Sequence, residues 1–360
     1  MTEALARVSR VNPEARLFGE GAAAMVQFAR SASPSSNTLL ADIGYSTQHG
    51  RYADDPRRIT IGTPVIGDGL SREIWRLPAV NEAGWVDEIG YALGDEFLFA
   101  HLLVAETSAT DIRRLTHQAY RRLLTFVGQT GCPHLLRIWN YLPHINAHER
   151  GMERYQAFCQ GRAMAFADCA IPERSFPAAT AIGCDAAGLS VHLLAARRNG
   201  TPIENPRQLS AYHYPSTYGP RPPSFARAMY YTGPQQPWQL AISGTASIVG
   251  HISMHPGDLK RQLLETIRNL ESVIDNTPIA SQTRKRRPPG LLKVYLRDPS
   301  SMQEVDAILR AWTAGDARIM YLHGDICRDA LHIEIEGHDA IPGRDQPHRR
   351  RATQARRSEE

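Results

Sequence analysis

The sequence has few cysteines and no long apolar run, and both absences narrow the class of protein. Its five cysteines form no CxxC pair and no spacing typical of metal ligands. No run of eighteen apolar residues occurs, so we expect no membrane-spanning helix. Residues 1–11 lack the apolar segment of a secretion signal. An odd number of thiols without such a signal indicates a reducing compartment, and we expect a cytoplasmic protein.

A concentrated basic surface of the kind that binds nucleic acid is also lacking. The 360 residues are 42% apolar and 22% charged, a globular balance, with a net charge of +4. Much of this positive charge lies in two segments, residues 284–287 and residues 341–360. The second segment holds six Arg against one Asp and two Glu. No aromatic residues are interleaved with these charges to stack on bases, so both stretches are interpreted as a solvated tail and linker.

What the sequence does contain is an internal duplication. Apolar residues at intervals of three and four predict helices, and short apolar or alternating runs predict strands. The first copy is predicted as strand 96–105, a helix from Asp111, strand 134–141, helix 149–166, and strands 176–184 and 189–196. The second is predicted as strand 238–244, a helix from Asp258, strand 291–297, helix 301–312, and strands 317–327 and 331–337. Each copy should pack its two helices on one face of one sheet.

The predicted fold class is therefore α/β (α+β), with two tandem sheet-plus-helices repeats. We expect an N-terminal domain over residues 1–200 that includes extra strands near 58–62 and 73–77, which either extend the first sheet or form a lid. A connector rich in Tyr, Pro and Arg follows at 201–235, then the second repeat at 236–340 and a disordered basic tail at 341–360.

Only the second copy carries carboxylates on its last strand. There Leu331, Ile333 and Ile335 alternate with His332, Glu334 and Glu336, so strand geometry puts the polar groups on one face. The matching run 189–194 of the first copy has no carboxylate. This asymmetry predicts one active site per chain, at Glu334. The pattern alone supports equally well two carboxylates that face water at a sheet edge.

Both copies resemble the Rid (reactive-intermediate deaminase) fold, a small chorismate-mutase-like sheet backed by two helices. The resemblance rests on Ile242-Ser243-Gly244, on the helix at 258–274 and on Ile333-Glu334-Ile335-Glu336. Rid proteins assemble as trimers with a cleft between subunits, where the first Glu of the I-E-I-E strand acts on a bound water. The resemblance implies this position for Glu334, and tandem repeats would form a pseudo-oligomeric unit.

Longer blocks resemble the chorismatase family, which is built on this fold. They are residues 137–143, 153–162, 205–215, 218–220, 225–228, 243–251 and 324–328, in family order. The resemblance implies cleavage of the enolpyruvyl ether of chorismate, a small dianion, with release of pyruvate. The ether breaks once its terminal methylene is protonated, so the reaction needs an acid but no metal or organic cofactor. We expect Glu334 to be that acid, with its pKa raised to about 6 by a poorly solvated site and by Glu336.

A second set of residues is expected to bind the substrate. Tyr212, Tyr214, Tyr218 and Arg227 would form a polar and aromatic wall, although the same segment also fits a plain surface connector. Arg162 and Arg318 are secondary candidates for binding a carboxylate. Gly244 and Cys327 resemble the branch of the family that aromatises the ring to 3-hydroxybenzoate, with some 4-hydroxybenzoate, whereas Ala and Val mark the hydrolytic branch. Cys327 alone is equally typical of a small buried apolar residue.

Other functions remain open at this point. One alternative is a hydrolytic chorismatase that gives a dihydroxycyclohexadiene carboxylate plus pyruvate. Another is a non-catalytic Rid-like protein that binds a small anion, and a third is an imine-hydrolysing deaminase, because the fold does not fix the function. The segment between the repeats argues against a plain deaminase. We expect a monomer with no nucleic-acid or membrane partner.

Overall fold

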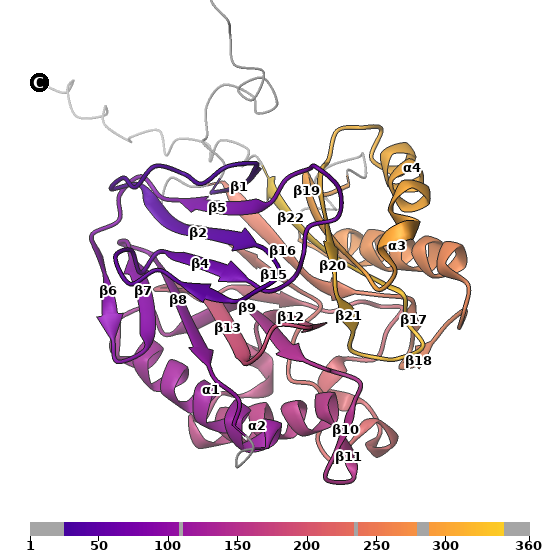
Figure 1. Ribbon diagram of the computed structural model, residues 1–360, viewed down its shortest axis with the longest axis horizontal. Coiled ribbons are helices and arrows are strands. Elements are labelled where there is room, and N and C mark those ends of the chain that lie inside the picture. Colours follow the sequence, from indigo (N-terminus) through magenta and orange to yellow (C-terminus); the bar gives the residue numbers. More distant parts are fainter. Residues whose placement is uncertain (1–24, 108–110, 234–236, 279–287, 342–360) are drawn as a thin grey trace, which may run out of the picture.

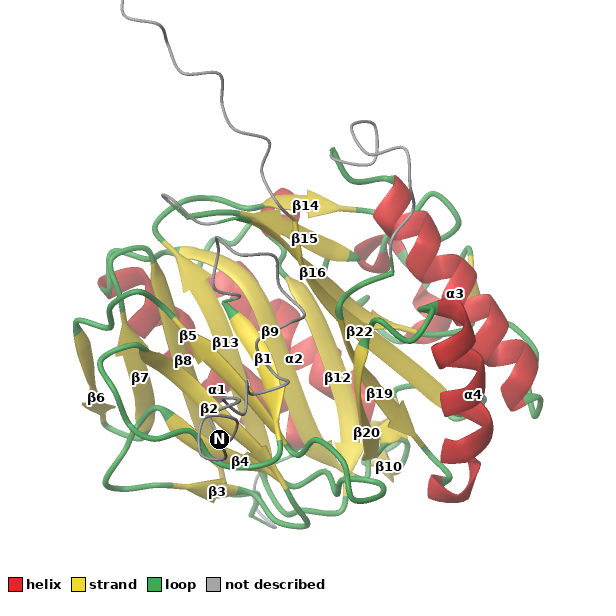
Figure 2. Ribbon diagram, turned by 90° about the horizontal axis from the view of Figure 1, so that it is seen from above, coloured by secondary structure: helices red, strands yellow, loops and turns green. Residues whose placement is uncertain are grey.

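The computed structural model describes residues 25–107, 111–233, 237–278 and 288–341. Three sheets make up its centre, and the long helices lie on the outside (Figures 1 and 2). The basic run 284–287 and the tail from residue 342 onward lie outside the described residues, so the interpretation of both stays a prediction. None of the helices in the described ranges is both long and apolar enough to cross a membrane.

The first repeat follows the predicted order of elements. They are β8 (Phe97–Val104), α1 (Ile112–Gln129), β9 (His134–Pro143), α2 (Arg154–Asp168), β12 (Ala178–Cys184) and β13 (Leu189–Ala196). Asp111 begins α1, because its side chain accepts a hydrogen bond from the backbone N–H of Arg114 at 2.8 Å. The strands lie in the order β12-β9-β13-β8, and only the β9–β12 pair is parallel.

The second repeat has the same topology. Its elements are β16 (Trp238–Thr245), α3 (Leu259–Asp275), β19 (Leu291–Leu296), α4 (Met302–Trp312), β20 (Arg318–His323) and β22 (Ile333–Ile341). Their order in the sheet is β20-β19-β22-β16, again with one parallel pair, β19–β20. Each repeat buries one apolar cluster between its sheet and its own two helices. The predicted duplication and fold class are confirmed.

The repeats extend further than the sequence indicated. A hairpin, β6 (Glu82–Val86) and β7 (Ile89–Leu93), continues the first sheet beyond β8. In the same way β14 (Thr201–Ile203) and β15 (Ala228–Tyr231) continue the second sheet beyond β16. The sequence predicted a separate connector at 201–235, but its two strands, β14 and β15, hydrogen-bond into the second sheet. Residues 204–227 are an insertion between those strands, with 3-10 turns at Ala211–His213 and Ser216–Tyr218.

Two predicted element boundaries were wrong. The helix expected from residue 149 begins at Arg154, because Arg150 and Gly151 adopt positive φ and turn the chain into a small hairpin, β10 (His148–Glu149) and β11 (Met152–Glu153). The strand expected at 317–327 divides at Gly324. Its second part, β21 (Asp325–Ile326), leaves its own sheet and pairs with β12 of the first repeat. This pairing joins the two repeats edge to edge.

The N-terminal residues form a sheet of their own. Its order is β1 (Val26–Ala29), β5 (Arg72–Arg76), β2 (Leu39–Tyr45), β4 (Arg58–Ile61) and β3 (Gly50–Arg51). The two strands predicted near 58–62 and 73–77 are confirmed as β4 and β5, but they do not extend the first repeat's sheet. They belong instead to a layer that lies over both repeats on the side away from the helices (Figures 1 and 2).

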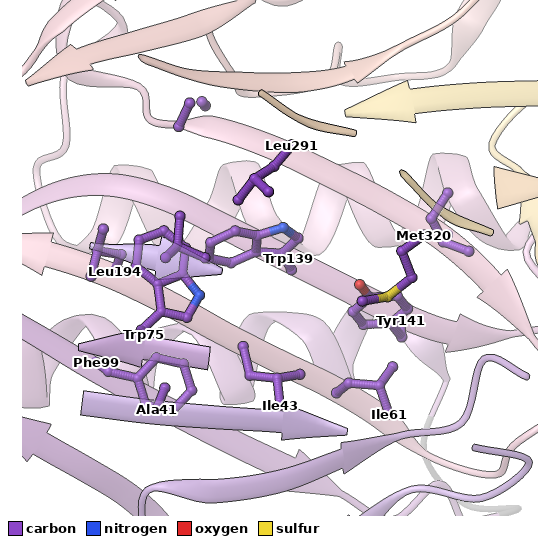
Figure 3. Close-up of a cluster of buried hydrophobic side chains, with 14 of the residues drawn as sticks. Ala41, Ile43, Ile61, Trp75, Phe99, Trp139, Tyr141, Leu194, Leu291 and Met320 are labelled. Carbon is purple, nitrogen blue, oxygen red and sulfur yellow. The ribbon is translucent and has the colours of Figure 1, made fainter. Parts of the chain in front are cut away.

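The main apolar core lies under this N-terminal layer. It combines Ile43, Ile61 and Trp75 of the N-terminal sheet with side chains from both repeats, as Figure 3 shows. Trp139 and Tyr141 come from β9, and Leu291 and Met320 come from the second repeat. Because all three sheets contribute to one core, the repeats are held at a fixed relative position. That position defines the cavity described next.

Candidate active site

A cavity lies where the second repeat meets the first. It has an empty volume of about 630 Å³, including solvent at its opening. The start of α2, the insertion 204–227, the end of β16 and the strand β22 all contribute to its wall. The lining residues are Glu153, Tyr155, Gln156, Tyr214, Tyr218, Pro223, Phe225, Arg227, Gly244, Ala246, Ile248, Cys327, Arg328 and Glu334. The expected cleft between repeats within one chain is therefore present.

Glu334 projects into this cavity from a central strand. β22 lies between β16 and β19, so Glu334 is not on a sheet edge facing water, and only 4% of the residue is exposed. Ile333 and Ile335 point the other way, into the core under α3 and α4. Among the described residues no group hydrogen-bonds to the Glu334 carboxyl. An ionised Glu334 would therefore have no hydrogen-bond donor to stabilise its charge. Burial, reinforced by the negative charge of Glu336, raises the pKa of Glu334 to about 8, and Arg137 and Arg227 only partly oppose this.

Glu336, two residues along the same strand face, is in the opposite state. Its carboxylate accepts hydrogen bonds from Arg137 Nη2 at 2.8 Å, Trp139 Nε1 at 2.9 Å and Thr180 Oγ1 at 2.6 Å. Lys293 Nζ lies 2.6 Å from Glu336 Oε1. Burial alone would raise the pKa of Glu336, but these cations outweigh burial and lower it. The environments push the two pKa values apart, which is how a site obtains one neutral acid beside one carboxylate.

Gly244 leaves room for the Glu334 carboxyl. Its backbone N–H donates to Thr180 Oγ1 at 3.0 Å, which ties the end of β16 to the first repeat. A Cβ at residue 244 would lie 1.9 Å from Glu334 Oε1 and 2.8 Å from its carboxyl carbon. Any larger residue here must therefore displace the acid.

Two guanidinium groups face the same cavity. Arg227, 4% exposed, donates from Nη2 to the Leu209 carbonyl and to the Tyr214 hydroxyl, both at 2.8 Å. Its buried Nε has no hydrogen-bond partner in the part of the chain that the structure describes. Arg328 stacks on Tyr218 at 4.1 Å from the ring centre. Within the described ranges neither guanidinium pairs with a carboxylate, so both charges are available to an anionic ligand.

Cys327 completes the wall beside the acid. Burial and the nearby Glu334 raise the pKa of its thiol, so it stays protonated and is a poor nucleophile. Glu153 also lines the cavity, where its carboxyl accepts a hydrogen bond from Asn146 Nδ2 at 3.3 Å, and burial raises its pKa. The site therefore holds two carboxyl groups and one small neutral thiol opposite two fixed cations.

Three expected substrate-binding residues lie outside this cavity. Tyr212 packs its ring against Phe176 at 5.6 Å between centroids. Arg162 is buried within α2, with its guanidinium 5.1 Å from the Phe158 ring. Arg318 begins β20, level with Leu291, while Glu334 lies level with Tyr295, four residues further along β19. None of the three is among the residues that line the cavity, and a substrate-binding role for them stays a prediction.

Sequence reasoning also missed residues that surround the acid. Arg328 and Glu153 lie within two blocks that carried the family resemblance, yet they were not selected. Arg137 and Lys293 stand as single charges within otherwise apolar strands, β9 and β19. A lone charge in a buried strand is rarely tolerated without a partner. That signal was present in the sequence, although it does not name the partner.

Metal-ligating groups are not gathered anywhere in the part of the chain that the structure describes. No cluster of three or more His, Cys, Asp or Glu side chains there has the arrangement needed to hold an ion. All five cysteines are free thiols. The expectation of a reaction without metal or cofactor stays a prediction, which the chemistry of Glu334 supports.

The fold and cavity define a class of protein: two fused α+β repeats that place one protonated carboxyl and two arginines at their junction. Known proteins share this plan. Residues 73–195 match the family described as chorismatase FkbO/Hyg5-like, N-terminal. A 3-hydroxybenzoate synthase of Streptomyces hygroscopicus is 39% identical over 278 residues, which cover 74% of this chain and 80% of that protein.

Two further comparisons cover more of the chain. A chorismatase of Streptomyces hygroscopicus is 34% identical over 322 residues, 86% of this chain and 93% of the relative. A crystal structure of a chorismatase superposes with a TM-score of 0.79 at 34% identity, over 88% of this chain and 98% of that one. The chain therefore belongs to the chorismatase family of enzymes.

Proposed function

We propose that this enzyme cleaves the enolpyruvyl ether of chorismate and releases pyruvate and 3-hydroxybenzoate, with Glu334 as general acid. The observation that carries the proposal is a buried carboxyl with a raised pKa that faces a cavity lined by Arg227 and Arg328, neither of which pairs with a carboxylate among the described residues. Chorismate offers two carboxylates for those cations and an ether that breaks only after protonation. The likeness to a 3-hydroxybenzoate synthase and to chorismatases supports the same substrate.

The steps follow from the position of Glu334. Its proton passes to the terminal methylene carbon of the enolpyruvyl group, which becomes a methyl group and leaves an oxocarbenium ion. The carboxylate that remains stabilises this cation at short range in a poorly solvated site. The bond between the ring carbon and the ether oxygen then breaks, so pyruvate leaves with the ether oxygen as its ketone oxygen. The oxygen of the neighbouring ring hydroxyl bonds to the vacated carbon, and its proton returns to Glu334. The three-membered ring opens at its other carbon–oxygen bond, and loss of the ring hydrogen with protonation of the oxygen gives 3-hydroxybenzoate, whereas direct loss of a ring proton without this shift gives 4-hydroxybenzoate. Positioned acid catalysis of this kind contributes about 10²–10⁴-fold.

The ring product depends on water. Pyruvate and 3-hydroxybenzoate together contain the atoms of chorismate, so no net water is consumed, whereas the hydrolytic alternative adds one water and keeps both ring oxygens. Gly244 leaves the Glu334 carboxyl in place, and Cys327 lines the same cavity as a small neutral side chain. We infer that the aromatising outcome dominates, with 4-hydroxybenzoate as a minor product.

One assay separates this proposal from the rivals. The purified protein is incubated with chorismate, pyruvate is followed with lactate dehydrogenase, and the ring product is separated by chromatography and identified by mass. Equimolar pyruvate and 3-hydroxybenzoate support the proposal. A dihydroxycyclohexadiene acid identifies the hydrolytic enzyme. Saturable chorismate binding without pyruvate identifies a small-anion binding protein, and turnover of imines alone identifies a deaminase.

The pH dependence of kcat/KM should follow Glu334. The proton donor must be protonated, and burial holds its pKa at about 8 in the free enzyme. We expect kcat/KM to stay level from about pH 6 to pH 8 and to fall tenfold per pH unit above, because chorismate's own carboxylates are ionised throughout. Initial rates in overlapping buffers of constant ionic strength measure this. A profile that is level through pH 10 contradicts a carboxylic acid donor.

Replacement of Arg227 should weaken binding more than chemistry. The buried Nε of Arg227 has no acceptor among the described residues, so a substrate carboxylate can accept a hydrogen bond from it. For Arg227→Gln we expect KM for chorismate to rise about 10- to 100-fold, the loss of one charge-assisted hydrogen bond. Arg318→Gln is the matched control, since Arg318 lies outside the cavity, and its KM should be unchanged. Equal KM values in the two variants contradict the assignment.

Two further expectations stay predictions. The active site is complete within one chain, because both repeats and the insertion contribute to it, and this supports a monomer. Sedimentation at enzymatic concentrations tests the oligomeric state. Five free thiols are typical of a reducing compartment and support a cytoplasmic location. Binding of nucleic acid is not expected.

A further inference from the structure

Next to Glu334 on the same face of β22, Glu336 belongs to a buried network of four charged side chains that come from all three sheets. Lys293 of β19 lies at its centre, with Nζ 2.6 Å from an oxygen of Glu336 and 2.6 Å from an oxygen of Glu73. Arg137 of β9 forms the second ion pair of Glu336, at 2.8 Å. Glu73 comes from β5 of the N-terminal sheet, the layer outside both repeats.

Glu73 is held in place as firmly as the site residues themselves. Only 3% of it is exposed. Its carboxylate accepts hydrogen bonds from the Tyr45 hydroxyl at 3.0 Å and from Trp75 Nε1 at 2.9 Å. These donors belong to the same sheet, so the N-terminal layer presents a pre-oriented anion to Lys293. A second cavity, with an empty volume of about 300 Å³ including solvent at its opening, is lined by Glu73, Lys293 and Glu336 and not by Glu334.

The charges of this network cancel. Glu73 and Glu336 supply two negative charges, and Arg137 and Lys293 supply two positive ones. Without Glu73 the group would carry one net positive charge, and Lys293 would face Glu336 alone. That surplus would favour ionisation of the next carboxyl on the strand, Glu334. A change of charge in the network reaches Glu334 because little water lies between buried groups to screen their interaction.

We propose that Glu73 is a positioning residue for the acid: by sharing Lys293 with Glu336, it holds the charge behind Glu334 at zero and so keeps Glu334 protonated. The inference rests on the proposed function of Glu334 as a proton donor. It also assigns a task to the N-terminal layer, which contributes none of the residues that line the cavity but completes the charge balance beside the acid.

Other titratable groups around the network do not change charge near pH 8. Glu334 itself is faced by Glu336, Arg137, Arg227 and the protonated thiol of Cys327. Around Lys293, the neighbours besides its two carboxylates are Tyr45, Tyr141, Tyr295, His192 and His338. Burial raises the pKa of each of these tyrosines and lowers that of both histidines, to about 3 for His338. The pKa of Lys293, which burial alone would lower, is raised by Glu336 and Glu73.

The test uses Glu73→Gln in the full-length enzyme. We expect the alkaline limb of kcat/KM to move down by about one pH unit, the order of effect of one buried charge at an effective dielectric constant of about 20. In the double variant Glu73→Gln/Lys293→Met one charge of each sign is removed, so the limb should return toward its wild-type position. Glu304→Gln, on the exposed face of α4, is the matched control and should leave the profile unchanged.

A second measurement is independent of turnover. Infrared difference spectra between each protein and its Glu334→Gln counterpart isolate the Glu334 carboxyl, and its titration should shift with the kinetic limb. Circular dichroism and melting curves report whether each variant is folded. A folded Glu73→Gln enzyme with an unmoved limb and unmoved titration overturns the inference. So does a uniform loss of rate at every pH, which indicates a purely structural contribution.

Failure of the proposed function looks different. If the wild-type protein does not turn over chorismate but the carboxyl titration still shifts down in Glu73→Gln and recovers in the double variant, the charge coupling stands and the chemistry assigned to Glu334 falls. A shift upward in Glu73→Gln contradicts the coupling whatever the enzyme's activity, because removal of a negative charge must favour ionisation.

Discussion

Glu334→Gln should abolish pyruvate release and leave chorismate binding intact. Gln is nearly isosteric with the protonated acid but cannot donate a proton to carbon, so kcat should fall by about 10²–10⁴-fold. Binding should persist, because Arg227 and Arg328 are untouched and the replaced group is neutral at pH 7 in the wild type. Pyruvate release in single turnovers and chorismate binding by calorimetry measure the two effects. Glu304→Gln is the control for a surface replacement.

The stability of this variant provides a check of the same proton. The folded-state pKa of Glu334 lies above that of an unfolded Glu, so the wild type gives up stability as pH rises from about 4.3 to about 8. Gln does not titrate, so Glu334→Gln should be the more stable protein at pH 7, by on the order of 3 kcal/mol. The difference should disappear near pH 4. An inactive variant that is less stable at pH 7 would point to misfolding rather than to loss of the acid.

Gly244→Ala should change both the rate and the product. The new methyl group would lie 1.9 Å from Glu334 Oε1, so the carboxyl must rotate away or the strand must shift. A displacement of about 1 Å at a reacting group costs about 10²-fold in rate. We expect 3-hydroxybenzoate formation to fall by about this factor, and the fraction of dihydroxycyclohexadiene product to rise as the acid moves relative to the ring. Chromatography of the ring products against pyruvate measures both.

The matched control for this replacement is Gly128→Ala in α1. A Cβ at residue 128 meets no atom within 4 Å, so neither rate nor product should change. Cys327→Val in the Gly244→Ala background should increase the hydrolytic fraction further, because the two residues line the same wall. Unchanged 3-hydroxybenzoate yield in Gly244→Ala contradicts the idea that residue 244 positions the acid.

Much of the fold was predictable because it depends on local patterns. Apolar residues at three- and four-residue spacing determine α1 and α3, and Asp111 and Asp258 cap them where expected. The alternation along 331–336 correctly put Glu334 and Glu336 on one face. The errors fell where backbone conformation or a distant partner decides. Examples are the turn at Arg150, which delays the start of α2, and β14 and β15, which pair with each other across the insertion.

The site was only partly predictable, for a related reason. Glu334, Arg227 and Gly244 were identified from blocks of sequence, and the structure brings them to one cavity. Arg318 and Tyr212 have suitable chemistry but do not line the cavity, since the position of a side chain depends on the register of the strand or turn that carries it. Lys293 and Glu73 were overlooked, because 220 positions separate them in the sequence and only packing of the N-terminal sheet brings them together.

The sequence by itself determined the duplication, the class of elements and the presence of one acidic strand without a counterpart in the other repeat. These are properties of short segments, which follow from local spacing of apolar and polar side chains. Only the tertiary structure decided that the pKa of Glu334 is raised while that of Glu336 is lowered, although both are glutamates on the same face of the same strand. Proton affinity depends on burial and on charges nearby in space, and those neighbours come from three sheets that meet only in the folded chain.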